Sequence, residues 1–325
     1  MTVGVGKPVF AAAETPPVGT GALDAADDPE IWVDPKDRSR GVILGTDKKA
    51  GLYVYDLAGR QLQFLPGGLP NNVDLRGGFA TPSGERVLIA ASDRGRGGAA
   101  LYLLDPASLK VTPWTVVPLD LAEPYGLCLG RRGDAFLMFV NGTDGQIRQV
   151  RLSAGPDGQA RSVEERRFAV ATQPEGCVVD DKRGRFYLGE EGRGIWRFDI
   201  GEGQAAGALI AEAPSAMLTP DVEGLGLLED GEAAWLIASS QGDSSFAVWR
   251  VDGTDPVFRG RFSVMARDGI DAVTGTDGVA AMGGQVGGFP GGLVVVQDDE
   301  DQGVQGARQN FKLVDWREVR RALGL

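Results

Sequence analysis

The sequence predicts an all-β fold, a six-bladed β-propeller of four-stranded blades that forms a single domain over residues 1–325. Six short segments begin with a polar or acidic residue and then turn apolar, and their first residues lie 44 to 54 residues apart. A recurrence near fifty residues is typical of propeller blades. The chain also carries 49 glycines and 18 prolines, as expected where many short strands are separated by turns. The six segments are 28–34, 72–79, 125–130, 175–181, 223–230 and 277–283.

Further strand-like runs follow each recurring segment. The second run is apolar and ends in a polar, glycine-rich loop, as in 41–51, and the third is rich in β-branched and aromatic residues. A weaker fourth run is found at 61–65 and 111–117, and helical spacing occurs only at 316–325. We expect residues 6–14 to add a strand to the last blade and so close the ring. A β-sandwich is the alternative architecture, but six comparable units fit it poorly.

The composition excludes several kinds of function. The formal net charge is −12, which argues against nucleic acids and anionic membranes as partners. No apolar run is long enough to span a membrane. The chain has no histidine, so histidine phosphatase chemistry and Ser-His-Asp triads are excluded. Nothing in the sequence demands an oligomer, and we expect a monomer.

The two cysteines, Cys128 and Cys177, imply no disulfide scaffold. Both lie in the apolar part of neighbouring segments, and we expect buried core cysteines. Cys177 and Arg183 have the spacing of cysteine phosphatases, but Asp180 and Asp181 would repel an anion in that loop.

Acidic residues gather at positions that a propeller brings together. In a meander blade the heads of the first strands share a face of the disc with the loops between the second and third strands. Crowded carboxylates repel one another, so a cation must compensate. Oxygen ligands without His or Cys indicate calcium, with magnesium or manganese as lesser options. The heads place Asp27, Asp28, Asn72, Asp74, Tyr125, Glu175, Asp221, Glu223, Asp271 and Asp277 on this face; the loops add Lys48, Lys49, Arg94, Arg96, Asp144, Glu190, Glu191, Gln241, Asp298, Asp299, Glu300 and Asp301.

The stretch 24–35, DAADDPEIWVDP, is the first of these heads. We expect Asp27 and Asp28 at the metal face, Asp24 as a turn residue, and Asp34 at the far end of the strand, away from the metals. The cations Lys48, Lys49 and Arg94 on the same rim suit an anionic, multivalent ligand such as a phosphate ester.

The chain resembles the β-propeller phytases, a family of calcium-dependent alkaline phytases, over nearly its whole length. The resemblance is carried by DAADDPEIWVDP, TDKKAGLYVYD, LPNNVDLR, EPYGLCLG, PEGCVVDDKRGRFYLGEEGRGIWRF, DVEGLGLL, ASSQGDSSFAVW and QNFKLVDW, in that order. It implies a six-bladed fold, several bound Ca²⁺ ions and hydrolysis of phosphomonoesters of myo-inositol hexakisphosphate (phytate). It also implies a secreted protein. The N-terminal residues lack the features of a signal peptide, so we expect the mature form.

The resemblance implies a role for each matching residue. Cleavage-site calcium ligands or their partners are Asp28, Glu175, Glu191, Asp221, Glu223 and Gln241; Asp27, Tyr125, Asp277 and Glu14 lie near that site. Structural calcium is expected around Asn72, Asp74, Asp271, Asp298 and Glu300. Phosphate-contacting cations are Lys48, Lys49 and Arg94. Thr143-Asp144 stands where the family commonly has a Lys-Glu pair. The resemblance therefore implies that Asp144 lies at a substrate-binding position, and that the second phosphate pocket is weaker because it lacks the lysine.

The implied mechanism is in-line attack on phosphorus by a calcium-bound water, with no phosphoenzyme and with the calcium complex of phytate as substrate. Two other functions remain open at this point. One is a propeller that binds phosphorylated ligands with structural calcium and little catalysis. The other is a calcium-dependent propeller lactonase, which would not need the cations of the rim.

Overall fold

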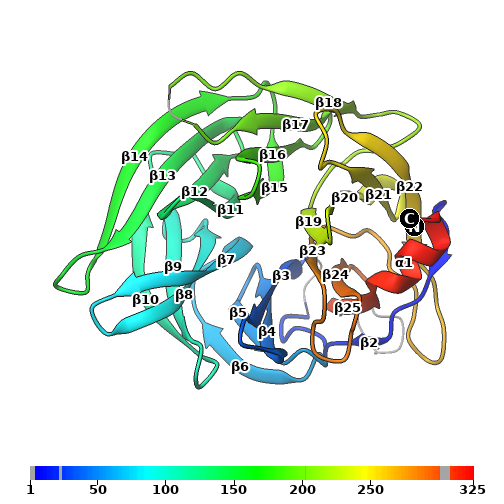
Figure 1. The fold of residues 1–325 in the computed structure, drawn as a ribbon, viewed down its shortest axis with the longest axis horizontal. Helices are drawn as coiled ribbons and strands as arrows, with labels where there is room; N and C mark the ends of the chain where they lie inside the picture. Colours follow the sequence, from blue (N-terminus) through cyan, green and yellow to red (C-terminus); the bar gives the residue numbers. More distant parts are fainter. Residues whose placement is uncertain (1–3, 22–23, 202, 301–307) are drawn as a thin grey trace.

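The computed structural model describes residues 4–21, 24–201, 203–300 and 308–325, and in it six β-sheets are arranged in a ring around a central channel (Figure 1). Blades one to four are simple four-stranded meanders, which confirms the predicted propeller. Their strands are β3 (Ala26–Asp34), β4 (Asp37–Asp47), β5 (Gly51–Tyr55) and β6 (Gln61–Pro66); β7 (Pro70–Thr81), β8 (Gly84–Asp93), β9 (Gly98–Asp105) and β10 (Lys110–Pro118); β11 (Pro124–Arg132), β12 (Ala135–Gly142), β13 (Gln146–Ala154) and β14 (Ala160–Ala169); and β15 (Pro174–Asp180), β16 (Arg185–Glu190), β17 (Gly194–Asp199) and β18 (Ala208–Glu212).

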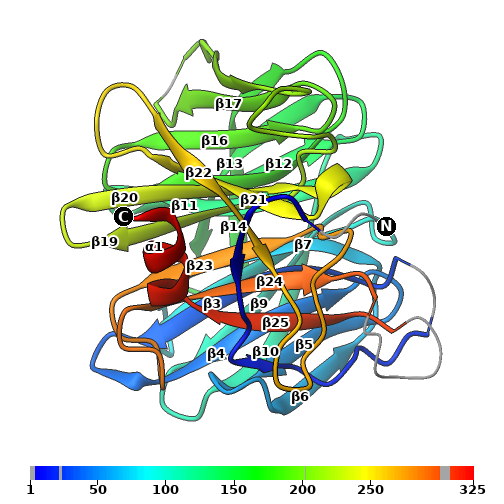
Figure 2. The same cartoon turned by 90° about the vertical axis from the view of Figure 1, so that its right-hand side faces the viewer.

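The N-terminal segment closes the ring through two blades. In blade six, β2 (Ala13–Glu14) pairs antiparallel with β25 and completes the sheet as its fourth strand, as the sequence predicted. In blade five, β1 (Lys7–Val9) pairs in parallel with β22 and becomes a fifth strand (Figure 2). The remaining elements are β19 (Leu225–Asp230), β20 (Ala233–Ser240), the 3₁₀ turn η1 (Gln241–Asp243), β21 (Ser245–Arg250) and β22 (Val257–Val264) in blade five, and β23 (Val279–Gly283), β24 (Gly292–Asp298) and β25 (Asn310–Asp315) in blade six.

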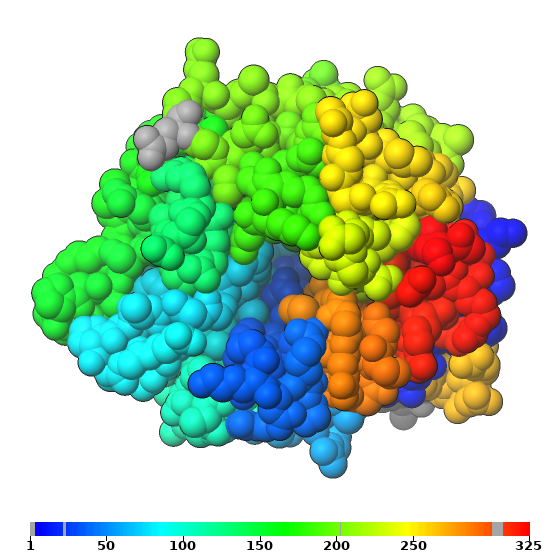
Figure 3. Space-filling view, in the orientation of Figure 1, coloured from blue at the N-terminus to red at the C-terminus, as the bar shows by residue number. Residues whose placement is uncertain are grey.

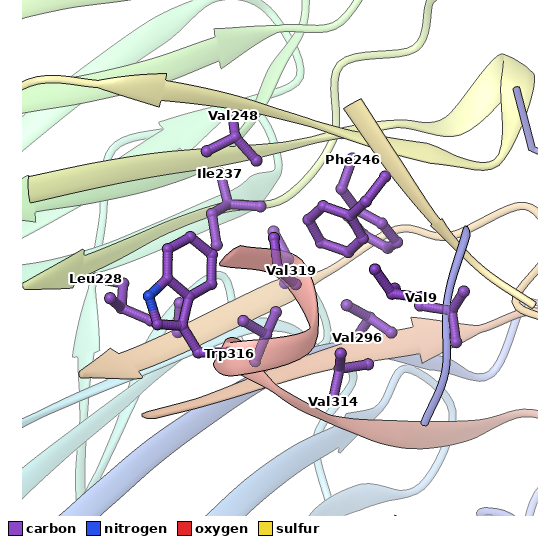
Figure 4. Packing of buried hydrophobic residues seen from close by; sticks show 14 of the residues in the cluster. Val9, Leu228, Ile237, Phe246, Val248, Val296, Val314, Trp316 and Val319 are labelled. Carbon is purple, nitrogen blue, oxygen red and sulfur yellow. The ribbon is translucent and has the colours of Figure 1, made fainter. Parts of the chain in front are cut away.

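Hydrophobic side chains fill each of the six interfaces between neighbouring blades. At the interface of blades five and six, Phe246 and Val296 pack together with Val9 from the N-terminal strand (Figure 4). The alternating and β-branched strand patterns therefore bury one face of each blade against the next.

The C-terminal helix α1 (Trp316–Leu323) packs Trp316 and Val319 into the same cluster (Figure 4). Asp315 caps its first turn by accepting a hydrogen bond from the Arg317 backbone N–H, and Gly324 ends it in a left-handed conformation. This helix confirms the helical spacing seen in the sequence. None of the helices in the described part of the chain has the length and apolar character needed to cross a bilayer.

The expectation that the cysteines are separate core residues is wrong. Cys128 in β11 and Cys177 in β15 form a disulfide across the inner strands of blades three and four, with their Cα atoms 5.7 Å apart. Both are buried, as predicted, in the cluster between these blades. The pairing arises because the two residues occupy matching places on adjacent inner strands, which a linear spacing of 49 residues does not reveal.

Candidate metal centre at the channel mouth

Three glutamates from neighbouring blades, Glu175, Glu191 and Glu223, meet at one end of the channel, which we call the mouth. Glu175 lies in β15, Glu191 directly follows β16, and Glu223 precedes β19. One carboxylate oxygen from each lies within 4.8 Å of the other two. The propeller places them together because the heads of the inner strands and the loop after a second strand lie on the same face.

Glycines next to the heads allow the inner strands to approach closely. A Cβ atom on Gly126 would lie 1.8 Å from the carbonyl oxygen of Glu175, and one on Gly176 would lie 2.0 Å from that of Glu223. Any larger residue would push neighbouring heads apart, so the glycine that recurs after Tyr125, Glu175 and Glu223 keeps their side chains within reach of one another.

The carboxylates at the mouth are buried and incompletely partnered. Among the described residues, Asp27 Oδ2 and Glu223 Oε2 have no hydrogen-bond partner. Burial raises the pKa of Asp27 and of Glu223 well above the usual range, and the nearby charge of Glu175 raises both further. Buried carboxylate oxygens without partners are costly unless a cation approaches them. This oxygen-rich donor set fits a hard cation such as Ca²⁺.

One buried lysine neutralises part of this charge. Lys48 Nζ lies 2.7 Å from Asp24 Oδ1 and 3.4 Å from both Asp27 Oδ1 and Asp277 Oδ2. Burial alone would lower the pKa of Lys48, but the charges of Asp27 and Glu175 outweigh it and raise the pKa overall. Lys48 is therefore charged and holds three acidic side chains at the mouth.

Asp24 has a larger part than the turn residue expected from the sequence. It does adopt a positive φ of 59°. Its carboxylate, however, contacts both predicted phosphate-binding lysines, Lys48 at 2.7 Å and Lys49 at 3.1 Å. Asp24 thus holds the two ammonium groups side by side.

Gln241 links the heads of blades five and six. Its side-chain amide donates to Asp277 Oδ1 at 2.6 Å, and its backbone N–H donates to the Asp221 carbonyl at 3.0 Å. Burial raises the pKa of Asp277 to about 6, although Lys48 lowers it in part. The structure thus brings Asp221, Gln241 and Asp277 to the mouth, where the sequence placed them.

Two amide side chains that hold the glutamates, Asn71 and Gln173, were not predicted from the sequence. Asn71 Nδ2 donates to Glu175 Oε1 at 2.5 Å and to Asn72 Oδ1 at 3.0 Å. Gln173 Nε2 donates to Glu191 Oε1 at 2.7 Å. The available signals were the doubled asparagine at the second head and an amide two residues before Glu175.

Asp28 and Asp74 extend the acidic lining into the channel and have backbone partners. Asp28 Oδ2 accepts from the Val73 N–H at 3.0 Å. Asp74 accepts from the Leu129 N–H at 2.7 Å and forms an ion pair with Arg76 at 2.6 Å. Asp74 is therefore largely neutralised by the protein itself.

Tyr125 and Arg94 complete the rim. Tyr125 is half-buried, and burial together with the charge of Glu175 raises its pKa, so the phenol stays protonated. Arg94 Nε is buried without a hydrogen-bond partner in the described structure, while Nη2 donates to the Lys48 carbonyl at 3.5 Å. Arg96, in contrast, pairs with Asp93 at 3.5 Å.

Four predicted acids lie outside this cluster or have other partners. Asp144 is exposed and accepts from the Gln146 N–H within its own turn at 3.2 Å. Glu300 is exposed, and Asp299 accepts from the Gln309 side chain. Asp301, which the sequence placed beside them, lies outside the described residues. Glu190 is fully buried and accepts from Trp196 Nε1 at 2.7 Å, which is a structural contact.

A second acidic cluster surrounds Lys312 in blade six. Lys312 Nζ is fully buried and contacts Glu14 Oε2 at 2.5 Å, Asp271 Oδ1, and Asp298 Oδ2 at 3.2 Å. Burial raises the pKa of Asp298 to about 6, although Lys312 lowers it in part. We call Glu14, Asp271, Asp298 and Lys312 the blade-six cluster.

This grouping differs from the one that the resemblance implied. Glu14 was expected near the cleavage site, but ring closure by β2 carries it to β25 and Lys312. Asn72 was expected with Asp271 and Asp298, but it lies in β7 and contacts Asn71, the partner of Glu175.

Comparison with known proteins agrees with this architecture. A model of the family described as Phytase matches residues 6–325. The chain is 36% identical over 330 residues to a protein of Bacillus subtilis (strain 168) named 3-phytase, a match that covers 97% of this chain and 85% of the relative.

Solved structures with little sequence identity share the fold. An auxiliary nutrient binding protein from Bacteroides thetaiotaomicron superposes with a TM-score of 0.56 at 9% identity, covering 94% of this chain and 76% of that one. BBS1N, solved in complex with ARL6DN, superposes with a TM-score of 0.50 at 11% identity, covering 95% and 97%. At such low identities these likenesses concern the arrangement of the blades alone.

Proposed function

Because the chain belongs to the phytase family, we propose that its channel mouth hydrolyses phosphomonoesters of phytate with the help of bound calcium. The observation that carries the proposal is the meeting of Glu175, Glu191 and Glu223 within 4.8 Å beside a rim of cations. Carboxylates hold the metal and cations hold phosphate oxygens, so the two kinds of group together suit a metal-assisted phosphate hydrolase.

The ligands we propose for the cleavage-site calcium are oxygens of the channel mouth. Unpartnered oxygens of Asp27 and Glu223 favour a cation there. When bound, Ca²⁺ would offset charge on the phosphoryl oxygens and lower the pKa of a water molecule. The proposed set is Asp27, Asp28, Glu175, Glu191, Asp221, Glu223 and Asp277.

The rim cations bind and orient the substrate in this proposal. Lys49 is exposed, and the buried Nε of Arg94 has no hydrogen-bond partner among the described residues. Lys48 is fixed by Asp24, Asp27 and Asp277, so its ammonium group meets a phosphate oxygen without first losing rotamer freedom. Asp144 lies in an exposed turn, and we place it at the edge of a second phosphate pocket.

Hydrogen bonds between side chains position the carboxylates. Gln241 holds Asp277, Asn71 holds Glu175 and Gln173 holds Glu191, each through an amide N–H that directs one carboxylate oxygen. Tyr125 keeps its phenolic proton next to Glu175 and can donate it to an oxygen of the substrate.

The net charge of −12 constrains the order of binding. A polyanionic substrate would be repelled by the mouth until cations offset the carboxylates. The calcium complex of phytate is therefore the substrate form that the mouth suits best.

We also propose that the protein acts outside the cytoplasm, as a secreted monomer. The disulfide between Cys128 and Cys177 supports this, because such bonds persist in oxidising compartments.

Phosphate release from phytate, measured with Ca²⁺ and after chelation, tests the proposal. We expect chelation to abolish activity and to lower the unfolding temperature of the same samples, and added Ca²⁺ to restore both, since a ligand that binds only the native state stabilises it. Full activity in excess chelator would contradict the proposal. Calcium-dependent stability without phosphate release would favour the non-catalytic phosphate-binding propeller instead, and hydrolysis of lactones without phosphate release would favour the lactonase.

A further inference from the structure

A cavity of about 660 Å³ lies on the opposite face of the disc from the acidic mouth. It is formed where the β3–β4, β7–β8 and β9–β10 hairpins of blades one and two meet, with Arg131 from the end of β11. Figure 3, which shows the face that carries α1, places blade one (blue) beside blade two (cyan). Asp34, the last residue of β3, lines this cavity.

Basic side chains from three blades line the cavity. They are Lys36, Arg40, Arg86 and Arg131. Arg40 spans the wall, because it donates to the Pro106 and Ala107 carbonyls and pairs with Asp34 at 3.5 Å. The other three side chains are less committed to the protein.

Lys36, Arg86 and Arg131 retain donor capacity. In the described part of the chain, neither Lys36 nor Arg86 forms an ion pair with a carboxylate, and Arg86 donates only to the carbonyls of Ser83 and Glu85. Arg131 stacks over Phe136 at 4.8 Å and pairs with the exposed Asp134 at 3.9 Å, and its Nε is buried without a hydrogen-bond partner among the described residues. A buried guanidinium N–H without a partner favours an incoming acceptor.

Three carboxylates line the cavity, and two of them, Asp34 and Asp105, are directed to the backbone, whereas Glu85 is exposed. Asp34 Oδ1 accepts from the Lys36 N–H and Asp105 Oδ1 accepts from the Ala107 N–H, both at 2.9 Å. These bonds hold the acids in their turns. A ligand would therefore meet Lys36, Arg86 and Arg131 together with the single acid Glu85, so positive charge prevails in the cavity.

The floor of the cavity is open at two glycines. Gly77 and Gly78 line it beside the Trp32 indole, and a Cβ on Gly77 would lie 3.3 Å from Trp32 Nε1. Because these positions carry no side chain, the indole N–H and the Arg131 guanidinium line the same cavity.

We propose that this cavity binds an anion, a phosphate group carried on a small organic molecule. Planar guanidinium groups and an ammonium group are the donors that phosphate oxygens prefer. The volume lies in the range of sites for small organic ligands and exceeds what a single oxyanion needs. The site is independent of the metal mouth and of the proposed hydrolysis, because it shares no residue with either acidic cluster.

Calorimetric titration of the calcium-loaded protein tests this site with two probes, inorganic sulfate and cyclohexylphosphonate, which has no ester bond to hydrolyse. The variant is the double substitution Lys36→Ala and Arg86→Ala. The matched control is Lys110→Ala with Arg161→Ala. It also replaces one lysine and one arginine, and both positions are exposed.

We expect the phosphonate to bind more tightly than sulfate, and the cavity variant to lose at least about tenfold in phosphonate affinity, since it removes two charge-assisted contacts. The control should bind as the starting protein does, and the kcat and KM for phytate should stay unchanged in both. Equal phosphonate binding by the cavity variant and the control would overturn the proposal. Binding of sulfate alone would overturn the assignment to an organic phosphate. Unfolding temperatures that match among the three proteins establish that lost binding reflects the site.

Discussion

The channel mouth and the blade-six cluster are both built from carboxylates around one buried lysine, but they balance charge differently. In the blade-six cluster, Lys312 contacts all three acids directly. At the mouth, Lys48 contacts Asp24, Asp27 and Asp277, whereas Glu175, Glu191 and Glu223 form no ion pair with any cation of the described chain. The mouth therefore has an excess of negative charge that the protein itself leaves uncompensated.

This difference separates a structural use of acidic residues from a functional one. The blade-six cluster joins β2 to β25 and Asp298 of β24, so its ion pairs help to close the ring. The mouth gains nothing structural from three crowded glutamates, since their repulsion opposes folding. We infer that the mouth is arranged for added cations, and the following substitutions test that contrast.

The largest effect is expected from Glu223→Gln at the mouth. The substitution keeps the shape of the side chain but removes one charge from a ligand, so we expect kcat for phytate to fall by about 10²–10³. The metal-free protein should be equally stable or more stable, because repulsion among the glutamates is relieved. Phosphate release, together with unfolding temperatures in chelator, measures both effects.

Glu229→Gln is the matched control for that substitution. Glu229 lies at the other end of β19 and pairs with Arg183 at 2.6 Å, away from the mouth. Its kcat should stay close to that of the starting protein. A near-normal rate for Glu223→Gln would remove Glu223 from the site.

A loss of stability rather than rate is expected from Lys312→Met in the blade-six cluster. Removing the cation leaves three carboxylates without their shared partner, so the free energy of unfolding should fall by about 3–5 kcal/mol. Denaturant unfolding measures the loss, with the exposed Lys110→Met as control. A loss below about 1 kcal/mol would show that the cluster does little to close the ring. The folded fraction should keep its kcat.

The architecture and most of the mouth could be predicted from the sequence. Each head repeats a short local pattern, and the geometry of a propeller places all six heads on one face. Asp27, Asp28, Glu175, Glu191, Glu223 and Gln241 all lie on the face that the repeat predicts. Contacts that depend on exact side-chain placement were not predictable. No local pattern relates the residues of three such contacts. These are the Cys128–Cys177 disulfide, the Asn71–Glu175 hydrogen bond and the Glu14–Lys312 ion pair.

The smallest effect is a pH dependence at the mouth. Burial, with the charges of Glu175 and Asp221, raises the pKa of Glu191 from 4.5 to about 7. Between these values the folded, metal-free protein binds more protons at Glu191 than the unfolded chain does, so this group lowers stability as the pH rises from 4.5 through about 7. Calcium binding requires the deprotonated carboxylate, so its affinity should rise over the same interval.

Unfolding temperatures of the starting protein and of Glu191→Gln, with chelator and with Ca²⁺ across this pH interval, isolate the contribution of Glu191. The substitution should flatten the decline in chelator and reduce the stabilisation by Ca²⁺ at the upper end. Identical pH profiles for the two proteins would contradict a raised pKa of Glu191 in the folded protein.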